Sequence, residues 1–229
     1  DIAVFGHEYG LLAGAGSRVD AREFLSIHAE RAGVAFAQST ATITDVTVVE
    51  SGTFAGLQLV NSQVRVQNFR VHGAQTAGVV VRGGSAKLED GVVTRTTAID
   101  DSSGDGVLVR SGEAELTSVL ISDSEGAGVL SGNAAKVTLR DVIVDRAKQG
   151  GVVTDYKGSL RADSVVIRNA RQAALVAVEG GRISGDAITV EGSTDDVAWA
   201  ECAADSAIQI TRLTSQLVPR QADCVRLTR

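Results

Sequence analysis

Gly78-Val79-Val80-Val81 and Gly106-Val107-Leu108-Val109 are two copies of the short motif that decides the fold of this chain. Motifs of this kind, most often opened by glycine, begin at residues 10, 33, 56, 78, 106, 128, 151, 174, 197 and 224 of the 229 residues. Most of the steps between these positions are 22 or 23 residues long. Such a period indicates one supersecondary unit that is stacked on copies of itself.

A second apolar run follows within most repeats, as in Leu116-x-x-Val119-x-Ile121 and Leu139-x-x-Val142-x-Val144. The spacing of two within these runs is the period of a β-strand. The chain holds a single proline, which agrees with stacked strands because proline interrupts the hydrogen-bonded ladder. We therefore expect an all-β protein with two or three short strands per repeat.

The repeat resembles the coil of right-handed parallel β-helix proteins of the pectate-lyase-like superfamily, from Gly10 to Leu227. This resemblance implies a right-handed single-stranded parallel β-helix, a solenoid of nine to ten coils with 22–23 residues per coil. The unbroken repeat predicts a single domain over 1–229. The chain begins with Asp1 and contains no methionine, so we expect it to be a processed or truncated part of a longer chain.

The alternation predicts which side chains fill the solenoid. We expect aliphatic columns inside it, built from Val34 with Phe36, Leu57 with Leu59, Val79 with Val81, and Val107 with Val109. The opening glycine suits a position that needs positive φ or a close approach of the backbone. A polar residue precedes the last inward aliphatic residues of the coil, where we expect a bend: Asp45, Asn68, Asp90, Ser118, Asp141 and Ser164.

The residue between the two inward aliphatics is predicted to face outward, yet it is apolar in six consecutive repeats. These residues are Val80, Leu108, Leu130, Val153, Val176 and Trp199. Monomers rarely expose a contiguous apolar patch. Three explanations stay open: burial against a partner, a one-residue error in the inward and outward phase, or harmless exposure. The first predicts a homo-oligomer, or contact with a neighbouring segment of a longer chain.

Composition limits the partners and suggests a compartment. A net charge of −6 and an isoelectric point near 5.1 disfavour nucleic acid as a partner. No apolar run approaches 18 residues, so no membrane span is expected. The two cysteines, Cys202 and Cys224, fall in the last long repeat. We predict a disulfide between them, and hence a secreted or cell-envelope protein, with two free thiols as the alternative.

The repeat that begins at Gly78 is 28 residues long and carries an insertion before Gly106. Insertions in solenoids form loops on one face and often build the site. Asp101, Ser103 and Asp105 place oxygen atoms at alternate positions before a glycine, as in the first half of a calcium loop. Calcium is therefore a candidate cofactor here. The alternative is an ordinary acidic loop, since position twelve of the pattern is Gly112 rather than glutamate.

The same superfamily includes enzymes that cut acidic polysaccharides, and some carry paired aspartates in a comparable loop. The resemblance makes Asp100 and Asp101 candidate carboxylates, with a base from Arg110 or Lys136. The chain departs from those enzymes, since no Asn-x-Asp precedes the pair and no His-Gly follows it. The basic stretch from Lys136 to Arg171 has a simpler interpretation as a solvated face with salt bridges to nearby aspartates.

We therefore expect a non-enzymatic secreted or cell-envelope solenoid that acts as a structural or binding module. It would associate with itself through the outward apolar columns, and polysaccharide is a possible ligand. The alternative is a carbohydrate-active enzyme, a lyase or hydrolase acting on uronic-acid polymers. A third possibility is a repeat domain of a large adhesin. It would also be a non-enzymatic module, and would differ only in the segments that flank the repeats. The fold by itself does not choose among these functions.

Overall fold

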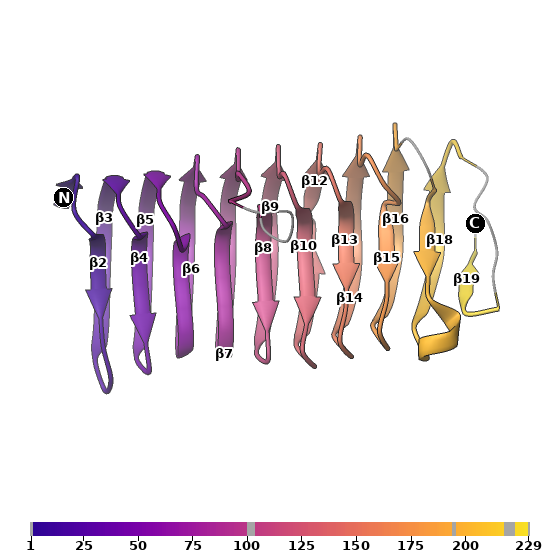
Figure 1. Ribbon diagram of the computed structural model, residues 1–229, viewed down its shortest axis with the longest axis horizontal. Helices are drawn as coiled ribbons and strands as arrows, with labels where there is room; N and C mark the ends of the chain where they lie inside the picture. The colour runs from indigo at the N-terminus through magenta and orange to yellow at the C-terminus, as the bar shows by residue number, and fades with distance from the viewer. Residues whose placement is uncertain (1, 100–103, 194–195, 218–222, 229) are drawn as a thin grey trace.

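The computed structural model describes residues 2–99, 104–193, 196–217 and 223–228. It is an all-β parallel solenoid of about nine turns with one short 3₁₀ helix, η1 (Cys202–Ala204), in the described part of the chain (Figure 1). The fold predicted from the repeat is therefore confirmed. No helix in these described ranges is long and apolar enough to cross a membrane.

Each coil passes through three faces of the solenoid. The strands of the first face lie toward the viewer in Figure 1, and we call this face the front sheet. The front sheet consists of β2 (Tyr9–Ala13), β4 (Ala32–Ala37), the first part of β6 (Ala55–His72), the first part of β7 (Ala77–Thr94), β8 (Asp105–Arg110), β10 (Ala127–Gly132), β13 (Gly150–Thr154), β15 (Leu175–Ala177) and β17 (Ala198–Ala200).

The strands behind the front sheet bend once and form the second and third sheets. They are β1 (Ile2–Phe5), β3 (Arg18–Ala29), β5 (Thr40–Ser51), the later parts of β6 and β7, β9 (Glu113–Ser122), β11 (Lys136–Arg140), β12 (Ile143–Asp145), β14 (Ser159–Arg168), β16 (Arg182–Glu191), β18 (Ala207–Ser215) and β19 (Val225–Leu227). We call the part before the bend the second sheet and the part after it the third sheet. All pairings are parallel, as a solenoid requires.

The bend between the second and third sheets is made by the predicted polar column. Asp45, Asn68, Asp90, Ser118, Asp141 and Ser164 all adopt a left-handed conformation with φ between 51° and 58°. Aspartate, asparagine and serine tolerate this conformation better than bulky residues because their short polar side chains bond nearby backbone groups. The interpretation of this column as turn chemistry is confirmed.

The core lies inside the coils and is lined by the predicted aliphatic columns. The eight inward residues named from Val34 to Val109 are all at most 1% exposed. Successive coils stack them about 4.8 Å apart. The predicted inward and outward phase is therefore correct, and the outward apolar residues do face away from this core.

Candidate functional site

One outward column runs the length of the front sheet, and we call it the centre column. Its members are paired in an unbroken register from coil to coil: Leu12, Ala35, Gln58, Val80, Leu108, Leu130, Val153, Val176 and Trp199. Leu12 and Trp199 are 58% and 50% exposed. Leu130, Val153 and Val176 are half-buried.

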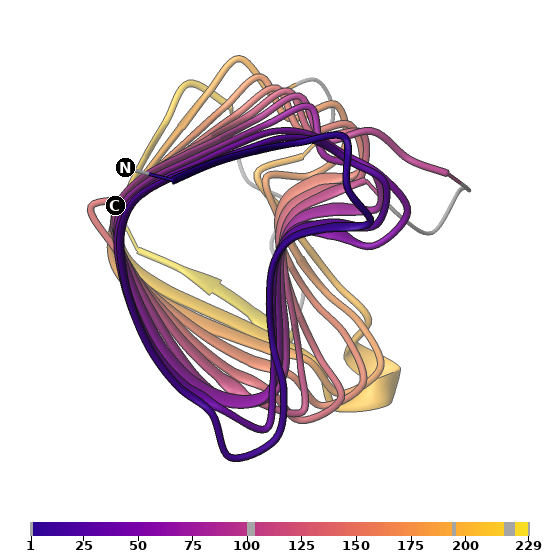
Figure 2. The same cartoon turned by 90° about the vertical axis from the view of Figure 1, so that its left-hand side faces the viewer.

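Val80 and Leu108 are 4% and 8% exposed although they face away from the main core. They pack with Ala55 and Ala77 in a second apolar cluster, against which Leu130 also packs. In Figure 2 the front sheet lies at the right, between the two rows of turns that join it to the other two sheets. We call these the upper and lower turns after their position in Figure 1. We call the outward face of the front sheet, between the upper and lower turns, the channel, and the apolar part of the centre column lies along its middle.

The upper turns join the third sheet to the front sheet and carry the insertion. Beside the insertion lies a pocket of about 550 Å³. Its lining includes four cations and two carboxylates: Arg95, Arg146, Lys148, Arg171, Asp123 and Glu125. Glu125 fixes the start of the insertion, since its Oε2 accepts the backbone N–H of Ala98 at 2.9 Å.

Both carboxylates of this pocket are held ionised by cations from the next coil. Arg146 donates two hydrogen bonds to Asp123, at 2.7 and 3.0 Å, and lowers the pKa of that carboxyl group. Lys148 donates to Glu125 at 2.6 Å and lowers its pKa in the same way. The pocket is thus a network of paired charges rather than a group of free acids.

Asp105 lies at the end of the insertion, just before Gly106, and belongs to the part that the structure describes. It takes the register position of Ala77 and is 3% exposed. Its Oδ1 accepts the backbone N–H of Ala127 at 2.8 Å. Burial raises the pKa of Asp105 to about 7, although the hydrogen bond from Ala127 and the charge of Arg110 act in the opposite direction. At neutral pH this carboxyl group is therefore close to its midpoint of titration, a property common in functional sites.

The lower turns join the front sheet to the second sheet and hold a pocket of about 490 Å³. Arg82 and Arg110 are register partners at its edge, and Asn61, Ser111 and Asn133 complete its polar lining. Nη2 of Arg110 lies 3.7 Å from Oδ2 of Asp155. Burial raises the pKa of Asp155, while Arg110 lowers it.

Of the predicted catalytic residues, the structure describes Arg110 and Lys136. Asp100, Asp101 and Ser103 lie outside the described residues. Arg110 lies at the lower edge of the front sheet, whereas Lys136 is on β11 of the second sheet and pairs with Glu113 at 3.2 Å. The two predicted bases are therefore on different faces of the solenoid. In the described residues, no group of three or more histidine, cysteine, aspartate or glutamate side chains is arranged to hold a metal ion, and calcium at Asp101, Ser103 and Asp105 stays a prediction.

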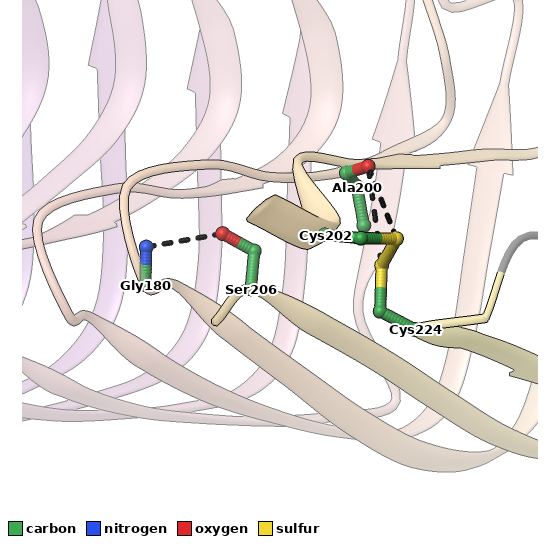
Figure 3. Close-up of a disulfide and its surroundings, with 5 residues drawn as sticks. All are labelled: Gly180, Ala200, Cys202, Ser206 and Cys224. Carbon is green, nitrogen blue, oxygen red and sulfur yellow. Dashed lines mark hydrogen bonds between the residues drawn. A yellow bond between two sulfur atoms is a disulfide. The ribbon is translucent and has the colours of Figure 1, made fainter. Parts of the chain in front are cut away.

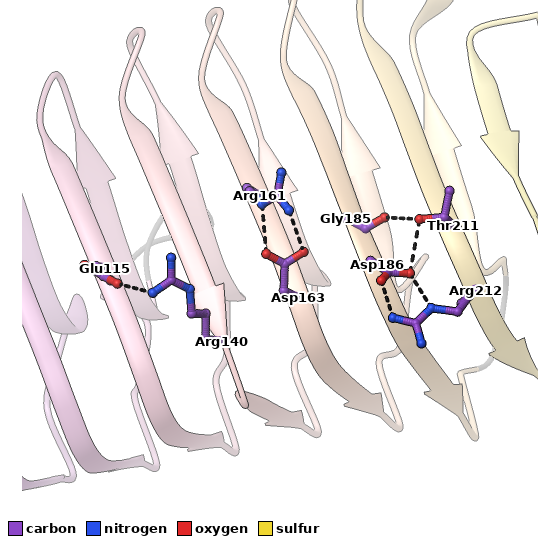
Figure 4. Close-up of polar contacts among 8 residues, drawn as sticks. All are labelled: Glu115, Arg140, Arg161, Asp163, Gly185, Asp186, Thr211 and Arg212. Carbon is purple, nitrogen blue, oxygen red and sulfur yellow. Dashed lines mark hydrogen bonds and ion pairs between the residues drawn. The ribbon is translucent and has the colours of Figure 1, made fainter.

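Most cations of the basic stretch form salt bridges, as the interpretation of a solvated face predicts. Most of their partners, however, are not the aspartates that lie nearby in the sequence. Arg140 pairs with Glu115 and Arg168 with Glu191, each about one coil away (Figure 4 shows the first pair). Arg161 instead pairs with Asp163 on its own strand. In a parallel solenoid, residues one repeat apart are register neighbours, so the acids of adjacent coils lie within reach.

The predicted disulfide is present. Cys202 and Cys224 are bonded, with their Cα atoms 5.4 Å apart, and the bond ties η1 to the start of β19 (Figure 3). It lies just after β17, the strand that carries Trp199. A disulfide is consistent with an oxidising compartment.

Arg82, which lines the lower-turn pocket, and Asp155, which pairs with Arg110 beside it, were not among the predicted site residues. The repeat contained a signal for them. Arg82 and Arg110 each follow the opening glycine by four residues, and Asp155 takes the same position two repeats further on. Aligning the ends of the motifs, and not only their apolar centres, would have found this outward column.

The family match agrees with this architecture. The family described as "Right handed beta helix region" matches residues 55–208. No curated protein matches the chain. Among solved structures, the A-module of mannuronan C-5 epimerase AlgE4 from Azotobacter vinelandii is 12% identical, with a TM-score of 0.35 over 92% of this chain and 79% of that one. The surface protein and adhesin PfbA of Streptococcus pneumoniae is 10% identical, with a TM-score of 0.30 over 90% and 69% of the two chains. The family match covers well over half of the chain, so this protein belongs to the right-handed β-helix family.

Proposed function

We propose that this chain is a non-enzymatic, secreted or cell-envelope binding module whose front sheet holds a linear polysaccharide. The observation that carries the proposal is the centre column, an outward row that stays in register from Leu12 to Trp199 and lies between the upper and lower turns. The disulfide between Cys202 and Cys224 supports the extracellular placement.

The shape of the channel favours a narrow ligand. Eight steps of about 4.8 Å separate Leu12 from Trp199, which gives a row roughly 38 Å long. Val80 and Leu108 are 4% and 8% exposed in the middle of this row, so a ligand would contact mainly the more exposed members, from Leu130 to Trp199. An extended chain fits between the turns and contacts several coils at once.

The chemistry of the channel suits a sugar polymer. Trp199 offers a half-exposed aromatic face, on which the apolar side of a sugar ring can pack. The polar groups lie at the turns on both sides, where they can bond hydroxyl or acidic substituents. A small number of polar groups around an apolar floor is the usual composition of a carbohydrate-sized site.

Binding to a panel of acidic and neutral polysaccharides tests this proposal. Leu130→Lys places a charge in the middle of the channel and is expected to lower affinity at least tenfold. Ile143→Lys is the matched control, because Ile143 is a half-buried outward aliphatic of the third sheet. Equal binding by both variants, or no binding of any polymer by the unaltered protein, would contradict the proposal.

Self-association through the same column is the second candidate. Leu130, Val153 and Val176 are half-buried aliphatics in a row that ends at exposed Trp199, and a surface of this kind is favourable to cover. Replacing both Leu130 and Val153 with lysine should then dissociate the protein without unfolding it. An unchanged mass in solution, measured by light scattering, would exclude this candidate.

The enzymatic alternative keeps one specific observation in its favour, the titration of buried Asp105 near neutral pH. Release of unsaturated or reducing-end products from uronic-acid polymers, with calcium and with a chelator, separates it from a binding module. Product formation that is lost in Asp105→Asn would replace the non-enzymatic proposal. Asp123→Asn is the control, since that carboxylate is held in an ion pair with Arg146.

A further inference from the structure

The lower-turn pocket departs from the charge pattern of the rest of the solenoid. Elsewhere a cation commonly faces an acid one coil away, as Arg65 faces Glu89 and Arg212 faces Asp186. Here Arg82 has another arginine, Arg110, as its register partner. Two residues of like charge thus occupy neighbouring register positions, with backbones about 4.8 Å apart, and line the same pocket in a protein whose net charge is −6.

Little negative charge compensates this pair. In the described part of the chain, no carboxylate lies within ion-pair distance of Arg82, and none lines the pocket. The carboxylate paired with Arg110 is Asp155, at 3.7 Å, which is too long for a hydrogen bond. Its other oxygen, Oδ1, is buried without a hydrogen-bond partner.

A glycine at position 132 leaves room for the guanidinium group of Arg110 and the carboxylate of Asp155. Gly132 is the register partner of Arg110 on the next coil. A Cβ atom at Gly132 would lie 1.9 Å from Oδ1 of Asp155 and 3.4 Å from Nη1 of Arg110. Because Gly132 has no side chain, Arg110 and Asp155 can approach each other from opposite sides of it. The pocket of about 490 Å³ beside them is large enough for an acidic sugar residue.

We propose that Arg82 and Arg110 form a subsite for one anionic group, a carboxylate or a sulfate, at the lower edge of the channel. The planar guanidinium group matches both anions with paired hydrogen bonds. An anion in the pocket that both arginines line would pair with their positive charges, and Asp155 is the internal competitor for Arg110. This inference rests on the proposed function in one respect, that the acidic group belongs to a polysaccharide in the channel.

The test compares an acidic hexasaccharide, its neutral counterpart and inorganic sulfate. Arg82→Gln is expected to lower the affinity for the acidic hexasaccharide about tenfold, measured by calorimetry, and to leave the neutral one unchanged. Arg22→Gln removes the same charge from the second sheet and is the control. Asp155→Asn removes the competing carboxylate with little change of shape, so it should strengthen acidic binding several-fold.

The outcomes separate the subsite from the proposed function. If the acidic hexasaccharide binds equally to the unaltered protein and to Arg82→Gln, the subsite is wrong although the channel binds sugar. If no oligosaccharide binds, the proposed function is wrong, and a titration with inorganic sulfate then tests the subsite by itself. Sulfate that shifts the side-chain Nε–H resonances of Arg82 and Arg110, and not that of Arg22, supports it. If sulfate does not shift the resonances of Arg82 and Arg110, the proposed subsite is wrong.

Discussion

Gly128 of the front sheet lies against Val144 of the third sheet so closely that a Cβ atom on Gly128 would stand 2.2 Å from Cγ1 of Val144. The same relationship recurs along the solenoid in the pairs Gly33–Val48, Gly56–Val71, Gly78–Val93 and Gly106–Ile121, each at 2.2 Å. None of these glycines has a positive φ. Close approach across the core, and not backbone conformation, is therefore the reason for the glycine that opens the repeat.

Replacing Gly128 with alanine should destabilise the protein by about 1–3 kcal/mol, because the added methyl group overpacks a rigid core. The free energy of unfolding in urea measures this effect. Gly14→Ala is the control, since a Cβ atom at Gly14 would meet nothing within 4 Å and its φ is not positive. If both variants unfold at the same urea concentration, the close contact with Val144 does not explain the repeat glycine.

The periodic features of this fold could be predicted from the sequence, and the features that depend on turns could not. Alternation placed Val34 and Phe36 in the core and Leu130 outside it, because strand geometry fixes both positions. It did not predict that Val80 and Leu108 are covered. Their burial comes from packing with Ala55 and Ala77 in a second cluster outside the main core, and no local period encodes that packing.

The ion pairs also combine a feature that the sequence predicts with one that it does not. The sequence predicted salt bridges for the basic stretch but assigned partners by nearness along the chain, as for Arg161 with Asp163. Arg140 instead reaches Glu115 on the preceding coil. The register between coils decides this pairing, and it requires the exact length of each turn. The lower-turn subsite was missed for a related reason, since Arg82 and Arg110 meet only through that register.

Arg212 donates to both oxygens of Asp186 and lowers the pKa of that carboxyl group to about 2 (Figure 4). Thr211 adds a further hydrogen bond at 3.1 Å. The contribution of Asp186 to stability is therefore fully present above its unfolded pKa and is lost as the pH falls through about 2. Arg212→Gln should return the pKa of Asp186 toward its ordinary value, as followed by carboxyl ¹³C resonances. A control variant, Arg182→Gln, should leave it unchanged, and a pKa near 2 in Arg212→Gln would contradict the assignment.

The disulfide closes a loop of 22 residues, so replacing both Cys202 and Cys224 with serine should cost about 3 kcal/mol of unfolding free energy. The effect should begin locally, because the amide of Ile208 donates to the carbonyl oxygen of Cys224 at 3.0 Å. Faster hydrogen exchange at Ile208 is the specific readout. Dithiothreitol should reproduce both changes in the unaltered protein and change nothing in the double variant. Equal exchange at Ile208 in all samples would show that the bond does not hold β19 in place.

Asp105 should make the stability of the protein depend on pH in the neutral range. Burial raises its pKa from 3.8 to about 7, so the folded state binds this proton more tightly than the unfolded chain does. The unfolding free energy should therefore decrease as the pH rises from about 4 to 7, by an amount on the order of a few kcal/mol, and this contribution should level off above 7. Asp105→Asn keeps an oxygen that accepts the N–H of Ala127 but does not titrate, so its unfolding free energy should decrease less across the same window. All other titrating groups are shared by the two proteins, and the difference between their curves isolates Asp105. Parallel curves from pH 4 to 8 would mean that the carboxyl group of Asp105 is ionised in the fold and that water reaches the end of the insertion.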